Sequence, residues 1–316
     1  ASEVSKKGYG DCKALTNYMR TLLTAAGIPS YYALIYNDDS VINFDKDFPR
    51  NGGNHAILMI PTDKDPIWLE NTSQRVAFNH LSYSSHNRNV LAVNENGIQI
   101  IDTPVYQPEE SKEKLIGKIQ IAEDGSISSE AHFEFSGGQY DSSLRLFSLK
   151  NDEMIDALKN RHYNLKIDQL AINNLKNDRD LAKINYDLNL KANSFSKKLG
   201  NDMFFPVMPY YQATTFSMND DRVLPFETSF PFQDDYELEY SIPAGYKFTE
   251  VPAPANFSTD FGSYTISFNL KDNKLSVHRI LTIKKGIYPK EKFKEYVAFR
   301  KKTASNDNTK ILISKL

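Results

Sequence analysis

Residues 8–13 read GYGDCK and contain Cys12, the only cysteine of the 316-residue chain. Asp11 is a typical N-cap residue, and Gly27 and Pro29 are typical of a helix end. This predicts a helix that begins at Cys12, where free N–H groups and the helix dipole favour a nucleophilic thiolate. Taken alone, Cys12 could equally be a small packed hydrophobe. Between these signals, apolar residues recur with the period of one helix face: Leu15, Tyr18, Met19, Leu22, Leu23 and Ala26.

Two short apolar segments downstream add a histidine and a carboxylate. Residues 54–61 read NHAILMIP, which predicts a buried strand with His55 at its start. Residues 67–72 read IWLENT, which predicts a second strand with Glu70 near its end. If the two strands form a hairpin, the start of the first lies beside the end of the second. His55 and Glu70 would then be neighbours, and Trp68 would share the strand face of Glu70.

With Cys12, these two residues give the Cys–His–carboxylate set of a nucleophilic enzyme. In such a set the imidazole is the base, and the acid fixes the tautomer of the imidazole. The sequence therefore predicts a candidate catalytic site formed by Cys12, His55 and Glu70.

The chain resembles the transglutaminase-like (papain-like cysteine) superfamily in five features. These are the GDCK helix start, the AGIP helix end, the tyrosine-rich segment from Ser30, the Asn-His strand and the Trp-Leu-acid strand. The resemblance is strongest to the bacterial branch in which this core is flanked by β-rich domains of unknown function. It is specific over residues 8 to about 104 and looser beyond. It implies that Cys12 is the nucleophile, His55 the base and Glu70 the acid, and that the cleft is lined by Tyr9, Asp11, Asn54 and Trp68.

The resemblance implies an α+β fold. Residues 1–104 would form a transglutaminase-like lobe with the catalytic helix on an antiparallel sheet, and residues 105–316 an all-β sandwich, with a split into two modules near residue 233 left open. The superfamily usually has aspartate at the position of Glu70, and several tens of residues before its cysteine, where this chain has eleven. We therefore expect a chain that lacks an N-terminal part and that alone shows little or no amidase or transamidase activity.

Period-two alternation dominates the second half of the chain, as in residues 236–242, 264–270 and 275–283, where Arg279 is the polar exception. This density of alternation is typical of an antiparallel sandwich. Two helices are predicted within this part, at residues 152–161 and 290–305. In the first part, residues 89–101 predict a hairpin with an Asn-Gly turn.

Composition excludes several classes of partner. The net charge is −2 and no long basic run occurs, which argues against nucleic acid or an anionic membrane as the main partner. No run of about 18 apolar residues is present, so no transmembrane helix is predicted for this segment. His80 and His86 do not share a helix face, and the acidic residues of 38–47 lack an EF-hand frame, so no metal or other cofactor is expected. The resemblance to exported bacterial proteins favours the periplasm or the cell surface.

Three functions remain open on the sequence alone. The favoured one is acyl transfer by Cys12 on a carboxamide of a protein or peptide, including a cell-envelope peptide, which gives hydrolysis with water or transamidation with an amine. The second is a catalytically inactive module that binds a peptide or glycan. The third is a structural spacer of the cell envelope in which Cys12 is only packed. The sequence does not indicate an oligomeric state.

Overall fold

The computed structural model describes residues 1–48, 52–95, 97–211 and 222–316. The chain divides into two compact units. Unit 1 comprises residues 1–106 together with two later segments, 137–144 and 177–183. Unit 2 comprises residues 107–136, 145–176 and 184–316. The sequence-based division at residue 104 did not include the two later segments in the first unit.

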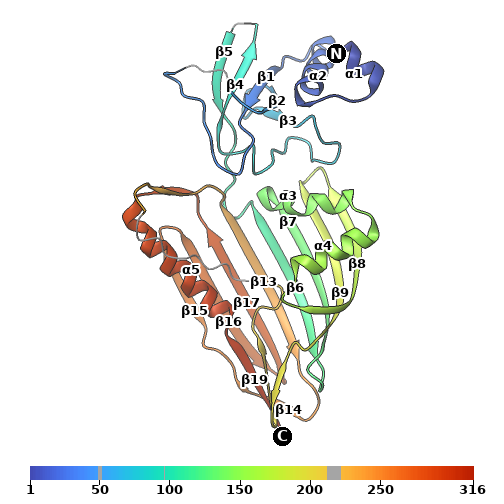
Figure 1. Cartoon of the computed structure of the whole chain (residues 1–316), viewed down its shortest axis with the longest axis vertical. Helices are drawn as coiled ribbons and strands as arrows, with labels where there is room; N and C mark the ends of the chain where they lie inside the picture. The colour runs from blue at the N-terminus through green and yellow to red at the C-terminus, as the bar shows by residue number, and fades with distance from the viewer. Residues whose placement is uncertain (49–51, 96, 212–221) are drawn as a thin grey trace. The chain divides into compact units, whose positions relative to one another are not determined.

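Unit 1 is built on a five-stranded sheet in the order β3-β2-β1-β4-β5 (Figure 1). The helices are α1 (Ser2–Lys7), α2 (Cys12–Ala25) and the short α3 (Tyr140–Leu144), which follows the 3-10 turn η1 (Gly137–Gln139). The strands are β1 (Tyr31–Ile35), β2 (His55–Ile60), β3 (Ile67–Leu69), β4 (Asn89–Asn94) and β5 (Gly97–Asp102).

Two predicted hairpins of unit 1 are confirmed. β2 pairs antiparallel with β3, with Met59 opposite Trp68, and β4 pairs antiparallel with β5. Asn96 of the predicted Asn-Gly turn lies outside the described residues. Alternate residues of the strands form a buried core that continues to Leu81 in the connection after β3: Ala33, Ile35, Ile57, Met59, Trp68, Leu81 and Val90. Because side chains alternate along β2, His55 lies on the same strand face as this core.

Helix α2 is fixed to the strands that carry the candidate site residues. The hydroxyl of Thr16, which is fully buried, donates to the Ala56 carbonyl of β2 at 3.0 Å. Asn71, which follows β3, donates from Nδ2 to Thr16 Oγ1 at 3.2 Å. These two hydrogen bonds link the Cys12 helix to both strands of the His55–Glu70 hairpin.

Unit 2 contains an eight-stranded sheet in the order β15-β16-β17-β13-β6-β7-β9-β8, a four-stranded sheet in the order β10-β11-β19-β14, and the pair β12-β18. The strands of the large sheet are β6 (Lys112–Ile121), β7 (Ile127–Ser136), β8 (Lys166–Asp178), β9 (Lys183–Asn193), β13 (Phe232–Ser241), β15 (Ala255–Thr259), β16 (Gly262–Lys271) and β17 (Lys274–Ile283). The remaining strands are β10 (Lys197–Leu199), β11 (Asp202–Pro206), β12 (Phe226–Thr228), β14 (Tyr246–Glu250), β18 (Gly286–Tyr288) and β19 (Lys310–Lys315).

The helical segments of unit 2 are η2 (Arg145–Ser148), α4 (Asn151–Arg161), η3 (Lys290–Lys292) and α5 (Phe293–Asp307). Helix α4 contacts the sheet at β6, where Arg161 forms an ion pair with Glu113 at 2.8 Å. Helix α5 lies along β15, β16 and β17 (Figure 1). The two helices therefore cover different parts of the large sheet.

The sandwich prediction missed one strand pairing. β13 pairs antiparallel with β17 but parallel with β6, so the large sheet is mixed, whereas an antiparallel arrangement was predicted. The two parallel strands are separated by more than a hundred residues, and alternation within each strand carries no information on the direction of its neighbour.

The predicted α+β class, with a transglutaminase-like lobe of a helix on an antiparallel sheet, is wrong for this chain. Strands make up 43% of the structure and helices 20%, and the strands are distributed over several sheets. In unit 1 the described connections 36–48 and 70–88 contain turns and extended segments but no helix. The motif residues around Cys12, His55 and Glu70 do not determine how the segments between them fold. The structure supports a β-rich fold.

Candidate active site

Cys12 is the first residue of α2, as the sequence predicts. Asp11 has extended backbone angles, and its Oδ1 accepts the Ala14 N–H at 2.8 Å, which is the expected N-cap bond. Gly10 is required at this turn, because a Cβ there would lie 2.9 Å from the Cβ of Ala14. Cys12 itself is half-buried and not in a disulfide. The thiol is thus placed at a capped helix N-terminus without being enclosed in the core.

His55 and Glu70 are brought together by the β2–β3 hairpin. His55 is the first residue of β2, Glu70 directly follows β3, and His55 Nε2 lies 2.8 Å from Glu70 Oε2. The other carboxylate oxygen, Oε1, accepts the Thr72 N–H at 3.0 Å and the Thr72 hydroxyl at 2.6 Å. Both side chains are largely buried, with 15% of His55 and 10% of Glu70 exposed. Glu70 is therefore held in one orientation against the imidazole.

The pKa shifts of the pair favour its charged form. Burial lowers the pKa of His55, but the hydrogen bond and the charge of Glu70, with a further contribution from the nearby Cys12, outweigh it, so that the pKa is raised. Burial raises the pKa of Glu70, but the hydrogen bond and charge of His55 and the two bonds from Thr72 outweigh it, so that the pKa is lowered. Because Glu70 engages Nε2, Nδ1 is the ring nitrogen that remains for proton exchange with a thiol.

Tyr32 is a neighbour of this site that the sequence argument missed. Burial raises the pKa of the Tyr32 phenol, and the negative charges of Cys12 and Asp11 raise it further. Tyr32 lies on β1, which pairs with β2. Its proximity to Cys12 depends on this pairing of β1 with β2. Because β1 begins with two consecutive tyrosines, its sequence alone does not indicate which of them lies near Cys12.

The other predicted cleft residues have different environments. Trp68 is 1% exposed and belongs to the core of unit 1. Tyr9 is 70% exposed. Asn54 bonds the backbone of Asn37 in both directions, accepting from the N–H at 2.7 Å and donating to the carbonyl at 2.9 Å. Asn54 therefore anchors the chain at the start of β2, directly before His55.

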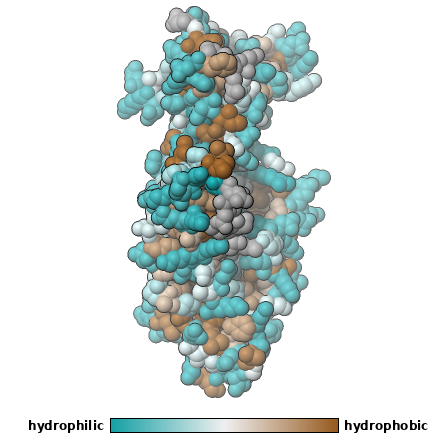
Figure 2. All heavy atoms as spheres, turned by 60° about the vertical axis from the view of Figure 1, so that its left-hand side comes forward, coloured by the Kyte–Doolittle hydropathy of each residue, from teal (hydrophilic) through white to brown (hydrophobic). Residues whose placement is uncertain are grey.

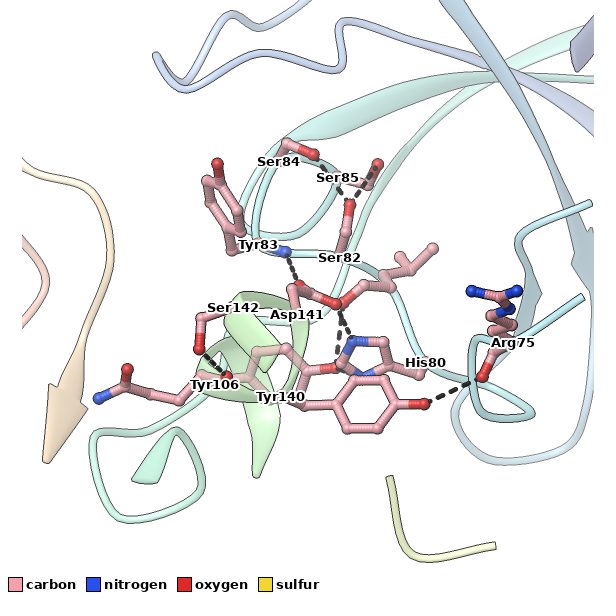
Figure 3. A network of polar contacts seen from close by, with 12 residues as sticks. Arg75, His80, Ser82, Tyr83, Ser84, Ser85, Tyr106, Tyr140, Asp141 and Ser142 are labelled. Atoms are coloured by element: carbon pink, nitrogen blue, oxygen red, sulfur yellow. Dashed lines mark hydrogen bonds and ion pairs between the residues drawn. The ribbon is translucent and has the colours of Figure 1, made fainter. Parts of the chain in front are cut away.

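A second carboxylate–histidine pair in unit 1 is part of a saturated network (Figure 3). His80 Nε2 bonds Asp141 Oδ1 at 2.9 Å, and the Tyr106 hydroxyl bonds His80 Nδ1 at 3.1 Å. Asp141 Oδ2 accepts the Tyr83 N–H at 2.7 Å. Because both ring nitrogens are engaged and the ring is buried, His80 is a structural residue and not a second candidate base.

One group of potential metal ligands lies in unit 2, where Asp235, Glu237 and His278 offer ligand atoms within 4.8 Å of one another. Register explains the group, because Glu237 is opposite His278 in the β13–β17 pair. Lys112 Nζ, however, bonds Asp235 at 2.9 Å, and His278 bonds the same carboxylate at 2.9 Å. These surface ion pairs already compensate the charge of Asp235, so we do not assign a metal centre there.

Figure 2 shows one face of unit 2 in the lower part of the view. Among the described residues on that face, hydrophilic ones predominate and hydrophobic ones occur in small groups. No helix of the described residues is long and apolar enough to cross a membrane.

Comparison with known families and structures gives limited matches. Residues 201–313 match a family described as a domain of unknown function with solved-structure structure (DUF3858). This segment is less than half of the chain and lies in unit 2. The sequence matches no protein of curated function.

One solved structure resembles the whole chain. It is a crystal structure of a protein from Parabacteroides distasonis described as a "putative protease", with a TM-score of 0.50 and 14% sequence identity. The similarity covers 99% of this chain and 45% of that one, so this chain spans less than half the length of the protein it resembles. At this level of identity the resemblance shows a common fold, and activity has to be argued from the residues.

Proposed function

We propose that unit 1 carries a cysteine-dependent acyl-transfer site that acts on a carboxamide, as a peptidase or transamidase. The observation that carries the proposal is the 2.8 Å contact of His55 Nε2 with Glu70 Oε2, in a hairpin that is hydrogen-bonded to the helix that begins at Cys12. The chain's resemblance to a protein described as a protease agrees with it at the level of the fold.

In the proposed reaction the Cys12 sulfur attacks the carbonyl carbon while His55 takes the thiol proton. The tetrahedral intermediate collapses as His55 returns that proton to the departing amine, which leaves an acyl-thioester on Cys12. Water or a second amine then attacks the thioester, with His55 as base, and regenerates the thiol. Glu70 orients the imidazole and stabilises its positive charge in both halves of the reaction.

Alkylation with iodoacetamide at pH 6 tests the activated thiol without requiring a known substrate. A free thiol, with its usual pKa of about 8.5, contains almost no thiolate at pH 6, so only an activated cysteine reacts quickly. We expect native Cys12 to react at least about 10-fold faster than Cys12 in the His55→Ala variant or in urea-denatured protein.

The matched control is His132→Ala, which removes a surface histidine paired with Asp187 in unit 2 and should leave the rate unchanged. If native protein and the denatured His55→Ala variant react at the same rate at pH 6, the site is not a nucleophilic one. A non-catalytic binding or structural module would then be the better description.

A further inference from the structure

A pocket of about 290 Å³ opens beside Glu70, between α2 and the connection that follows β3. Leu15 and Met19 line it from α2, Glu70 lies at the end of β3, and Val76 and Phe78 line it from the connection. Pockets for drug-sized ligands usually measure about 300–1,000 Å³, so this volume suits a single side chain.

The pocket adjoins the candidate nucleophile along the helix. Leu15 follows Cys12 by three residues, which places it on the same helix face about 4.5 Å further along the axis. Consecutive residues of an extended peptide are about 3.3–3.6 Å apart. A peptide whose carbonyl lies at Cys12 can therefore place the side chain of an adjacent residue in this pocket, while Glu70 contributes both to the pocket wall and to the His55 contact.

The lining combines apolar side chains, which make up the larger part of it, with polar ones that include Asn71, Ser73 and Gln74. Phe78 is 65% exposed at the pocket although it is a large aromatic residue. Trp68 also lines the pocket, and its indole N–H is buried with no hydrogen-bond acceptor among the described residues. The burial of this donor shows that Trp68 forms the floor of the pocket and does not project into it.

The lining contains one charge of each sign, Glu70 and Arg179. Both oxygens of Glu70 are engaged by His55 and Thr72, so Arg179 is the charge that we expect a ligand side chain to meet. Its Nε donates to the Val76 carbonyl at 3.2 Å, which fixes the guanidinium to the pocket wall. A guanidinium matches carboxylate geometry and repels an ammonium group. The pocket should therefore disfavour a lysine side chain in particular.

The wall formed by residues 73–79 is held in place by several hydrogen bonds. The Tyr140 hydroxyl donates to the Arg75 carbonyl at 3.2 Å (Figure 3). Asn177 Nδ2 donates to the same carbonyl at 2.8 Å. Asn79 Oδ1 accepts the Trp68 N–H at 2.8 Å. A wall fixed before the ligand arrives does not have to be ordered on binding, which favours selective recognition.

We propose that this pocket is a specificity subsite that takes an apolar side chain of the acyl-donor peptide, from the residue next to the one that carries the reacting carbonyl. Arg179 makes a carboxylate side chain second best and a lysine side chain worst. The inference rests on the proposed function, because an acyl donor is defined only if Cys12 reacts.

The test uses chloromethyl ketones of the form acetyl-Xaa-Ala-CH₂Cl, where Xaa is Leu, Glu or Lys. Cys12 alkylation is followed by mass spectrometry, and each rate constant is divided by the iodoacetamide rate constant of the same variant. We expect the normalised rate constant to be highest for the Leu reagent, lower for Glu and lowest for Lys, with Leu faster than Lys by at least about 10-fold. Met19→Gln should reduce that preference to about threefold or less, and Arg179→Glu should invert the order of Glu and Lys.

Leu22→Gln is the matched control, because Leu22 lies on the same helix, is 46% exposed and is not part of the pocket. It should retain the full preference. The measurements are repeated at pH 9, where an unactivated thiol also reacts, so that selectivity is readable even if iodoacetamide shows no activation at pH 6. Equal normalised rates for the three reagents at both pH values would overturn the subsite and leave the proposed function standing. Slow iodoacetamide labelling with retained selectivity at pH 9 would overturn the function but not the apolar recognition.

Discussion

His55 and Glu70 make the stability of unit 1 depend on pH within a defined window. The pKa of His55 is raised on folding, so its contribution is complete below about pH 6.5 and is lost as the pH rises through the folded value. The pKa of Glu70 is lowered, so its contribution is present above about pH 4.5 and is lost as the pH falls through the folded value. The pair therefore stabilises most between these two values.

Glu70→Gln removes the charge and keeps the shape. We expect a loss of about 2 kcal/mol in the free energy of unfolding at pH 5.5 and a smaller loss at pH 9, because the contribution of protonated His55 is lost as the pH rises through its folded value. Urea unfolding followed by fluorescence measures this in unit 1, because Trp68 is the single tryptophan. Glu239→Gln, which breaks an exposed ion pair with Lys274, is the control and should change stability little at either pH. A loss of equal size at both pH values would contradict the charged pair.

At the scale of the element, the start of α2 depends on one capping bond. Asp11→Ala removes the acceptor of the Ala14 N–H, and we expect a loss of about 1 kcal/mol in unfolding free energy, with fraying of the turn that holds Cys12. Asp11→Asn keeps a side-chain acceptor and should lose less than half as much. Urea unfolding followed at Trp68 separates the two, and equal losses for Ala and Asn would mean that charge and not capping fixes the turn.

Helix α5 is tied to the large sheet by a buried ionic cluster. Arg279 of β17 is fully buried, and its guanidinium bonds Asp307 of α5 at 3.0 Å and Asp234 of β13 at 3.4 Å. Burial lowers the pKa of Arg279, but the charges of Asp307 and Asp234 outweigh this and hold the pKa well above its usual value. The polar exception in the alternating strand is therefore the residue that joins three elements.

Arg279→Met removes the guanidinium that bonds both buried carboxylates. We expect a loss of about 3–5 kcal/mol in unfolding free energy, measured by far-ultraviolet circular dichroism in urea. The triple variant that also carries Asp234→Asn and Asp307→Asn should recover a large part of the loss. A single variant within 1 kcal/mol of wild type would show that the cluster does not hold α5.

The sequence predicts correctly those elements that are determined by residues close together in the chain. The start of α2 follows from Asp11, and the β2–β3 hairpin follows from two apolar segments separated by a five-residue turn, so the approach of His55 to Glu70 could be anticipated. Arg179 could not be, because it reaches the same pocket from a turn more than a hundred residues further along the chain. The fold class failed for the same reason, since the pairing of distant strands has no signature in any single segment.

At the scale of the whole molecule, we expect the free energy of unfolding to fall in acid because of one buried histidine in unit 2, His162. His162 is 1% exposed and lies against the rings of Phe133 and Tyr210. Burial, and next the charge of Arg161, lower the pKa of His162 to about 3. The unfolded chain takes up a proton near pH 6.5 and the folded chain only near 3, so stability falls as the pH falls between these values.

The measurement compares wild type with His162→Phe by circular dichroism in urea from pH 7 to pH 4. We expect the stability difference between them to change by up to about 1.4 kcal/mol per pH unit below pH 6, with the wild type losing more. His132→Ala, at the surface of the same unit, should follow the wild-type slope. Parallel curves for wild type and His162→Phe would contradict a neutral buried imidazole.

The make-up of unit 1 also bears on how this protein could be rearranged in evolution or cloning. A gene piece that ends at the linker near residue 106 would omit residues 137–144 and 177–183. It would thereby lose Asp141, which bonds His80, and Tyr140 and Asn177, which donate to the Arg75 carbonyl. It would also lose Arg179 of the pocket wall. Exchange at that linker therefore does not transfer a self-sufficient module. The segments that complete the unit that holds Cys12 lie within the sequence of its neighbour, so we expect a stable Cys12 unit only from a gene that encodes both.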